Sequence, residues 1–270
     1  MSALFSLKGK AVLITGATGV LGEGFVRAVA HAGGNVGILG RNAEVAERRA
    51  QEVNAAGGRA LALVADVLSE EALIAARNRM LDTFGQIDGL VNAAGGNIPE
   101  GVIDPSADLF DLNMDGLRRV LDVNLMGSIL PTQIFGKTMA GKGGSIINIS
   151  SMTAQRAITK VLGYTLAKTA IDGYTRWFAN ELANRFGDTI RMNAIAPGFF
   201  LTEQNRNLLT QPDGSYTARG EAVIRQTPFK RFGDPDELSG ALIWLLSDAS
   251  KFVTGTVVTV DGGFIMNSGV

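Results

Sequence analysis

The sequence predicts an α/β fold in which helices cover both faces of a doubly wound, mostly parallel sheet. Three observations support this fold class. Short apolar runs alternate with amphipathic segments along the 270 residues. These runs are apolar at successive positions, as expected of strands that are buried on both faces. A glycine-rich turn joins the first run to an alanine-rich segment, which is typical of a strand–helix–strand unit.

The predicted elements alternate between strands and helices. The first strand, residues 11–15, is an apolar run that ends in a glycine turn, and the helix 20–32 is closed by Gly33 and Gly34. Later strands are short apolar runs, and later helices are longer segments with apolar residues at helical spacing. The other predicted strands are residues 35–39, 60–65, 87–92, 145–149, 190–195 and 256–260. The other predicted helices are residues 43–55, 70–84, 117–139, 163–186 and 236–246.

Residues 1–270 are predicted to form a single domain. One-sheet α/β folds reach this length, and no repeat, low-complexity tract or linker rich in Pro, Gly or Ser divides the chain. The least regular stretch is about residues 198–233, which contains Pro212, Asp213 and Gly214. We expect this stretch to form a lid-like segment over a substrate site.

Composition excludes several classes of function. The formal net charge is −1 and no long basic run occurs, so we expect no nucleic-acid partner and no binding to a membrane. The chain has no cysteine and one histidine, His31, which disfavours metal sites and Ser-His-Asp chemistry, and we expect no metal. The chain shows neither a signal-peptide core nor an apolar stretch of membrane-spanning length, so a cytoplasmic protein is expected.

A glycine turn at residues 15–22 has the chemistry of a dinucleotide seat. It follows the first strand and opens a helix, so that backbone N–H groups and the helix N-terminus can approach a pyrophosphate. Gly16 is expected to make the tight turn, and Gly22 the close contact between helix and strand. Turn geometry alone would also explain a glycine cluster, but its place after the first strand favours a dinucleotide.

The end of the second predicted strand indicates which dinucleotide binds. An acidic residue there holds the ribose 2′-hydroxyl of NAD, whereas an arginine accommodates the 2′-phosphate of NADP. This chain has Gly40 and Arg41 at that point, which favours NADP(H). The alternative is that Arg41 is a solvated cation at the start of a helix.

Tyr164 and Lys168 form the predicted acid–base pair. Four residues apart on a helix, they share one face, where the ammonium favours the phenolate and lowers the tyrosine pKa from about 10. Ser151 ends an apolar run, so its hydroxyl is expected at the carboxyl edge of the sheet, where ligands bind. Taken separately, the three also fit a packed ring, a solvated cation and a loop or cap serine.

These motifs together resemble the single-domain branch of the short-chain dehydrogenase/reductase family over about residues 7–263. The matching motifs are residues 15–22, 66–67, 92–95, Asn124, Ser151, residues 164–168, Pro197 and Gly198 with Thr202, and residues 260–263. The resemblance implies a Rossmann-like fold of about seven strands, NAD(P)-dependent reversible carbonyl reduction, and assembly into dimers or tetramers. One departure is Val20, where the branch has its middle glycine; Gly19 stands one position earlier, a spacing similar to that of the extended branch.

The resemblance also implies roles for individual residues. Tyr164 exchanges a proton with the substrate oxygen, Ser151 polarises that oxygen, and Asn124 binds Lys168 through its backbone and a water. The implied catalytic residues are therefore Asn124, Ser151, Tyr164 and Lys168. The implied cofactor-binding residues are Gly16, Thr18, Gly19, Val20, Leu21, Gly22, Arg41, Asp66, Val67, Asn92, Ala93, Gly95, Tyr164, Lys168, Pro197, Gly198 and Thr202. Sequence alone would make Asn124 a polar helix residue and Thr202 a helix cap.

Residues 95–97, 130–137 and 197–206 resemble the D-mannonate oxidoreductase group of this family. That resemblance implies interconversion of D-fructuronate and D-mannonate and favours NAD(H), in tension with Arg41. A sugar-acid carboxylate needs cationic and polar partners. The candidate substrate residues are Asn97, Arg156, Lys160 and Arg206. The alternatives are another polyol or keto-gluconate dehydrogenase of the same family, and a dinucleotide-binding protein without turnover.

Overall fold

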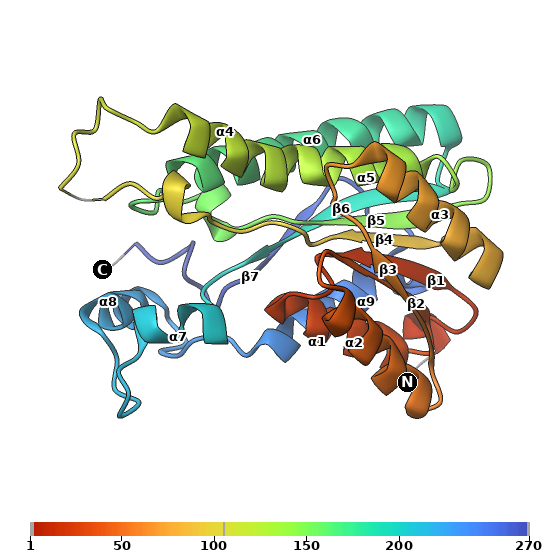
Figure 1. Ribbon diagram of the computed structural model, residues 1–270, viewed down its shortest axis with the longest axis horizontal. Coiled ribbons are helices and arrows are strands. Elements are labelled where there is room, and N and C mark those ends of the chain that lie inside the picture. Colours follow the sequence, from red (N-terminus) through yellow and green to blue (C-terminus); the bar gives the residue numbers. More distant parts are fainter. Residues whose placement is uncertain (1–2, 105, 269–270) are drawn as a thin grey trace.

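A seven-stranded sheet with strand order β3-β2-β1-β4-β5-β6-β7 organises the molecule in the computed structural model, which describes residues 3–104 and 106–268 (Figure 1). Each strand is parallel to its neighbours. The strands are β1 (Ala11–Thr15), β2 (Asn35–Gly40), β3 (Arg59–Val64), β4 (Gly89–Asn92), β5 (Gly144–Ile149), β6 (Ile190–Pro197) and β7 (Val257–Val260). The predicted fold class and the strand number that the resemblance implied are thus confirmed. The strand order reverses between β1 and β4, and ligands of open α/β sheets bind at the carboxyl ends of strands where such a reversal occurs.

Helices cover both faces of the sheet (Figure 1). One face carries α3 (Glu70–Phe84), α4 (Met114–Leu121), α5 (Gly127–Gly136) and α6 (Leu162–Phe186), and the other carries α1 (Val20–His31), α2 (Ala43–Ala55) and α9 (Ser239–Leu246). Each face has its own apolar core: Phe25 and Ile38 are fully buried on the α1 side, and Leu13 and Phe135 on the α5 side. None of the described helices has the length and hydropathy needed to cross a bilayer.

The single helix predicted over residues 117–139 is wrong. The structure has α4, a π-helical turn at Asp122–Met126 and then α5, so the helix begins earlier and ends earlier than expected. It begins at Met114 because the side chain of Asn113 accepts a hydrogen bond from Gly116 N–H. The interruption coincides with Asn124, whose side chain bonds backbone outside the helix. π-helical turns of this kind often mark functional sites.

The stretch at residues 198–233 is also more regular than predicted. It contains α7 (Glu203–Leu209) and α8 (Ala218–Gln226), which enclose a small apolar cluster of Leu209, Val223 and Phe232. Two backbone hydrogen bonds join its ends: Leu201 N–H donates to Gly233 O at 3.2 Å, and Gly233 N–H donates to Phe199 O at 2.9 Å. The segment is therefore a folded unit on a closed base; its role as a lid stays a prediction.

Candidate active site

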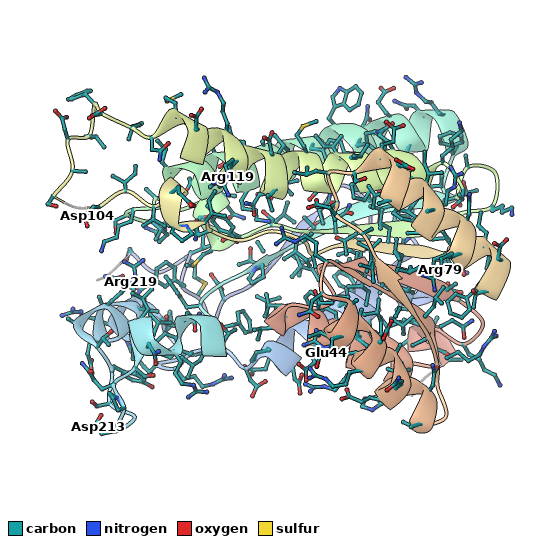
Figure 2. All side chains as sticks on the ribbon, in the orientation of Figure 1. Glu44, Arg79, Asp104, Arg119, Asp213 and Arg219 are labelled. Atoms are coloured by element: carbon teal, nitrogen blue, oxygen red, sulfur yellow. The ribbon has the colours of Figure 1, made fainter. Side chains whose placement is uncertain are left out.

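The sequence motifs converge at the carboxyl edge of the sheet. The glycine turn follows β1, residues 93–95 follow β4, Ser151 follows β5, and Gly198 follows β6. Two segments flank this end of the molecule, the loop before α4 and the segment that carries α7 and α8 (Figure 1). Figure 2 shows Asp104 on the first segment, and Asp213 and Arg219 on the second.

The turns after β1 and β4 pack directly on each other. Gly16 has φ +65°, and a Cβ placed there would lie 2.6 Å from Ala93 O. A Cβ at Gly22 would lie 2.4 Å from Gly16 O. The hydroxyl of Thr15 accepts hydrogen bonds from the N–H groups of Ala93 (3.1 Å) and Ala94 (3.2 Å). Only glycine fits at positions 16 and 22, and the turn is held to β4 through the Thr15 hydroxyl.

The N-terminus of α1 is suited to a pyrophosphate. Gly19 is its cap residue, and no side chain of the described residues caps the helix. The N–H groups of Thr18, Val20, Leu21 and Gly22 have no hydrogen-bond acceptor among residues 3–104 and 106–268. Four free donors at a helix start form an anion site, so the turn fits a dinucleotide. Val20 offers its N–H as a glycine would, although its side chain occupies space that the family's glycine leaves open.

Arg41 and Asp66 lie together at the ends of β2 and β3. The Arg41 side chain is 80% exposed, and its Nη1 atom lies 3.9 Å from Asp66 Oδ2. Thr18 packs against Gly40, where a Cβ would lie 2.4 Å from the threonine hydroxyl. Val67 is buried against Gly127 of α5. An arginine already paired with a carboxylate is suited to either ribose, because Asp66 can accept from a hydroxyl and Arg41 can bind a phosphate.

Asn92 lies in the core, and its side chain ties the sheet to the helices above it. It is 1% exposed and donates to Thr132 Oγ1 of α5 and to Asn148 Oδ1 of β5, both at 2.9 Å. Asn148 in turn donates to Thr175 Oγ1 of α6 at 2.9 Å. This asparagine ladder, Asn92 and Asn148 with Thr132 and Thr175, fixes the β4 end from which residues 93–95 project.

Ser151 lies beside Tyr164, close enough for its hydroxyl to act on the tyrosine pKa. Ser151 Oγ accepts from Thr153 N–H at 3.2 Å, which fixes the hydroxyl just beyond β5. Burial raises the pKa of Tyr164, and the neighbouring Ser151 hydroxyl opposes that rise. The expectation that Lys168 lowers this pKa is therefore not met in the protein alone. Lys168 Nζ lies over the tyrosine ring, 5.4 Å from its centroid.

Lys168 is buried beneath the tyrosine, with 4% exposure, and Nζ donates to Ile149 O at 2.8 Å. Burial lowers the pKa of Lys168 to about 8, and the charge of Asp172 opposes that fall. Asp172 is itself buried and accepts a hydrogen bond from the Ser150 hydroxyl. The sequence analysis missed Asp172 and Ser150. The available signal was spacing, since Asp172 lies one helical turn after Lys168 and Ser150 adjoins Ser151.

Asn124 is fully buried and binds the loop after β4. Its Nδ2 donates to Gly96 O (2.8 Å) and to Val120 O (2.9 Å), and its Oδ1 accepts from Gly96 N–H (2.9 Å). Gly95 lies between Asn124 and Lys168: a Cβ there would lie 2.5 Å from Asn124 Oδ1 and 3.5 Å from Lys168 Nζ. The carbonyl of Asn124 accepts from the Ser128 hydroxyl at 3.2 Å. Asn124 and Lys168 are therefore neighbours, while the direct partner of the ammonium is Ile149 O.

Replacing Lys168 with methionine is expected to change how stability depends on pH. The lysine pKa is about 8 in the folded protein and higher in the unfolded chain, so above pH 8 the unfolded state binds more protons. The free energy of unfolding of the wild type should therefore rise by about 2 kcal/mol more between pH 8 and 9.5 than that of Lys168→Met. Urea unfolding at both pH values measures this difference. Lys142→Met, at an exposed lysine, should keep the wild-type rise; a Lys168→Met protein that keeps it too contradicts the buried titration.

The candidate substrate residues have different environments. Arg156 donates to Ile265 O and to Asn267 O, at 2.6 to 2.9 Å, so its guanidinium fixes the C-terminal segment. Two backbone carbonyls thus already accept from Arg156, and its role in binding a substrate carboxylate stays a prediction. Lys160 is exposed, with φ +74°, and its carbonyl accepts from Ile103 N–H. Asn97 is exposed.

Residues after β6 meet the motif at the end of the chain. A Cβ at Gly198 would lie 2.6 Å from the Cα of Asp261, so the turn after Pro197 lies against the segment after β7. Thr202 is the cap residue of α7 and forms a capping box with Asn205. Arg206 lies on α7 and is exposed; it forms no ion pair with the described part of the chain.

The parallel sheet carries an anion-binding turn after its first strand. A serine, a tyrosine and a buried lysine lie beside that turn. This combination defines a dinucleotide-dependent oxidoreductase. A family model described as enoyl-(acyl carrier protein) reductase matches residues 16–265. The chain belongs to the short-chain dehydrogenase/reductase family and is an NAD(P)-dependent enzyme of that family.

Three relatives illustrate this membership. An uncharacterized oxidoreductase of Bacillus subtilis, UxuB, is 43% identical over 98% of both chains. A protein from Haemophilus influenza, provisionally named D-mannonate oxidoreductase and solved with bound NAD, is 41% identical, with a TM-score of 0.91 over 98% of both chains. A gluconate 5-dehydrogenase from Burkholderia cenocepacia, solved with NADP and tartrate, is 34% identical, with a TM-score of 0.85 over 98% of both chains.

Proposed function

We propose that this enzyme interconverts a ketone and a secondary alcohol on a sugar acid, and that D-fructuronate and D-mannonate are the first pair to test. The observation that carries the proposal is the meeting of Ser151, Tyr164 and buried Lys168 beside the glycine turn. Two relatives support the substrate class, one named for D-mannonate and the other for gluconate.

In the proposed reaction, reduction of the ketone requires the transfer of one hydride and one proton to the carbonyl group. The bound nicotinamide supplies or accepts the hydride. Tyr164 donates its phenolic proton to the carbonyl oxygen in reduction and removes it in oxidation. Ser151 donates a hydrogen bond to the same oxygen and stabilises the charge that develops on it. Lys168 lies under the tyrosine ring, where its positive charge favours the phenolate that remains after proton transfer.

Both dinucleotides remain candidates for the cofactor. One relative was solved with NAD and another with NADP. Arg41 offers a guanidinium for a 2′-phosphate, and Asp66, 3.9 Å from it, offers a carboxylate for a 2′-hydroxyl. We therefore propose that the enzyme uses NAD(H) and accepts NADP(H) less well, since the negative charge of Asp66 beside Arg41 disfavours a 2′-phosphate there.

A turnover screen tests the proposed function. Purified enzyme is given D-fructuronate, 5-ketogluconate and simple neutral ketones, each with NADH and with NADPH, and cofactor oxidation is followed by absorbance. Turnover of fructuronate above the other ketones supports the first substrate pair. Turnover of a neutral ketone but of neither acid rejects a sugar-acid substrate. Cofactor binding without turnover of any substrate favours the alternative of a non-catalytic dinucleotide-binding protein.

Replacing Arg206 with alanine is expected to raise KM for a sugar acid about tenfold and to leave KM for an uncharged ketone within about twofold. A charged hydrogen bond between a guanidinium and a carboxylate is worth about 1.4 kcal/mol or more, which corresponds to that factor. Arg225→Ala on the neighbouring helix α8 is the matched control, since Arg225 is also an exposed arginine in the last turn of its helix. Equal changes in KM for both substrates would count against a carboxylate contact at Arg206.

Other properties stay predictions of the sequence. They are the single domain over residues 1–270, the cytoplasmic location and assembly into dimers or tetramers. Exposed apolar side chains on α6, Leu166 and Trp177, are compatible with subunit contacts. Light scattering on the purified protein would decide the assembly.

A further inference from the structure

Arg49 is a buried arginine that neither the sequence motifs nor the proposed chemistry uses. It lies on α2, yet its guanidinium reaches the glycine turn before α1. Nη1 donates to the carbonyl of Ala17 and, at 2.9 Å, to the carbonyl of Gly19. Nη2 donates to Glu23 Oε2 at 2.7 Å, in the first turn of α1. The residue is only 7% exposed.

The two carbonyl contacts determine where the neighbouring N–H groups point. In a trans peptide the C=O and the following N–H point in opposite directions. The carbonyl of Ala17 shares a peptide plane with the N–H of Thr18, and the carbonyl of Gly19 shares one with the N–H of Val20. Because one guanidinium nitrogen donates to both carbonyls, both N–H groups point away from that nitrogen. These are two of the donors that have no acceptor within the described residues.

We propose that Arg49 is a positioning residue for the cofactor: it holds the carbonyls of Ala17 and Gly19 so that the N–H groups of Thr18 and Val20 are aligned for the dinucleotide pyrophosphate before binding. Arg49 does not touch the cofactor itself in this proposal. Its charge is balanced by Glu23, which also accepts from Arg27 Nη1 at 3.3 Å. A donor fork that reaches three oxygens requires a guanidinium, since an ammonium presents its hydrogens from a single point.

The role matters at this turn because a glycine-rich backbone is otherwise free to rotate. Glycine residues lose more conformational entropy on ordering than other residues, and binding must supply that cost if the protein has not already done so. Gly16 and Gly22 are fixed by packing. Gly19 is held less tightly, because a Cβ placed there would have one close neighbour, Gly16 O at 3.2 Å. Arg49 therefore acts at the part of the turn that packing holds least.

The test compares Arg49→Lys with Arg48→Lys. The two arginines are adjacent on α2, but the Arg48 side chain is 57% exposed and pairs only with Glu52 at 3.7 Å among described residues. Dissociation constants for NADH and for ADP-ribose are measured by isothermal titration calorimetry, together with kcat at saturating cofactor. ADP-ribose retains the pyrophosphate and lacks nicotinamide. We expect Arg49→Lys to weaken both ligands about tenfold, with kcat within about twofold, and Arg48→Lys to change neither.

Each other outcome overturns the proposal. Unchanged affinity in Arg49→Lys shows that the turn is aligned without the fork, and a loss for NADH but not for ADP-ribose assigns the effect to the nicotinamide end. An equal loss in Arg48→Lys shows that the effect does not depend on the buried guanidinium. If Arg49→Lys does not fold, Glu23→Gln replaces it, because this change loosens the guanidinium without removing it. A smaller loss of about threefold for both ligands is then expected, and unchanged affinity rejects the proposal. Binding of ADP-ribose does not depend on the substrate, so failure here is distinguishable from failure of the sugar-acid assignment.

Discussion

Tyr164→Phe is expected to lower kcat about 10³-fold while the dissociation constant for the cofactor stays within about twofold. A positioned general acid contributes about 10²–10⁴-fold to a proton-transfer reaction, and phenylalanine removes only the hydroxyl that carries the proton. The ring would still cover Lys168 Nζ, which lies 5.4 Å from its centroid. Steady-state kinetics at saturating NADH or NADPH, with a calorimetric titration of the cofactor, separates the two quantities.

Tyr174→Phe is the matched control for this substitution. Tyr174 lies on the same helix, α6, but its ring packs against Phe178 and the apolar core on the α5 side. We expect its kcat within about threefold of the wild type. A Tyr164→Phe enzyme with wild-type turnover would remove the proposed proton transfer and favour a protein that binds a dinucleotide without using it.

Gly16→Ala is expected to lower the free energy of unfolding by about 3 kcal/mol and to abolish measurable cofactor binding. The left-handed conformation at φ +65° costs an alanine roughly 1–2 kcal/mol. The added methyl group would lie 2.6 Å from Ala93 O, and relieving that overlap costs roughly 1–3 kcal/mol more. Because the neighbour is backbone, the turn itself must move, and the N–H groups of α1 move with it. Urea unfolding and cofactor titration measure the two effects.

Gly57→Ala separates strain from crowding. Gly57 has φ +84°, and nothing lies within 4 Å of a Cβ at that position. The control should therefore lose only about 1–2 kcal/mol and bind cofactor normally. If both alanine variants lose the same free energy of unfolding, the packing of the glycine turn against the end of β4 does not contribute to stability.

The sequence predicted the parallel sheet and the carboxyl edge at which the motifs lie. Strands buried on both faces are apolar at every position, so their places along the chain are recognisable without tertiary information. A parallel arrangement then brings the residues after β1, β4, β5 and β6 to one edge. That reasoning placed Ser151 beside Tyr164, and the Ser151 hydroxyl lies close enough to the tyrosine to act on its pKa. Their roles in catalysis stay predictions.

What the sequence could not predict depends on partners that are distant in the chain. Arg48 and Arg49 are indistinguishable as neighbouring charges in a polar helix, yet one is exposed and the other is buried against the glycine turn. In the sequence Arg156 is an isolated cation, whereas in the structure its guanidinium donates to the carbonyls of Ile265 and Asn267. The π-helical turn at Asp122–Met126 coincides with hydrogen bonds between Asn124 and Gly96, a pairing distant in the chain that helix propensity does not reveal.

Burial also reversed one electrostatic expectation. The spacing of Tyr164 and Lys168 predicted a lowered tyrosine pKa, but desolvation dominates in the protein alone and raises it. The same burial lowers the pKa of Lys168 to about 8. Sequence spacing gives the distance between two charges but not how far each is removed from water. Here the removal from water determines whether the pKa of Tyr164 is raised or lowered.

The asparagine ladder under the site constrains how this protein can change over evolutionary time. Asn92 donates to Asn148 and to Thr132, and Asn148 donates to Thr175. Both asparagines are buried away from water. An apolar replacement of one asparagine would strand the amide of its neighbour, at a cost of about 1–3 kcal/mol, whereas replacing both would leave fewer unmatched groups. Viable descendants should therefore alter the two positions in concert or not at all, and a library that varies them singly would sample mostly unstable proteins.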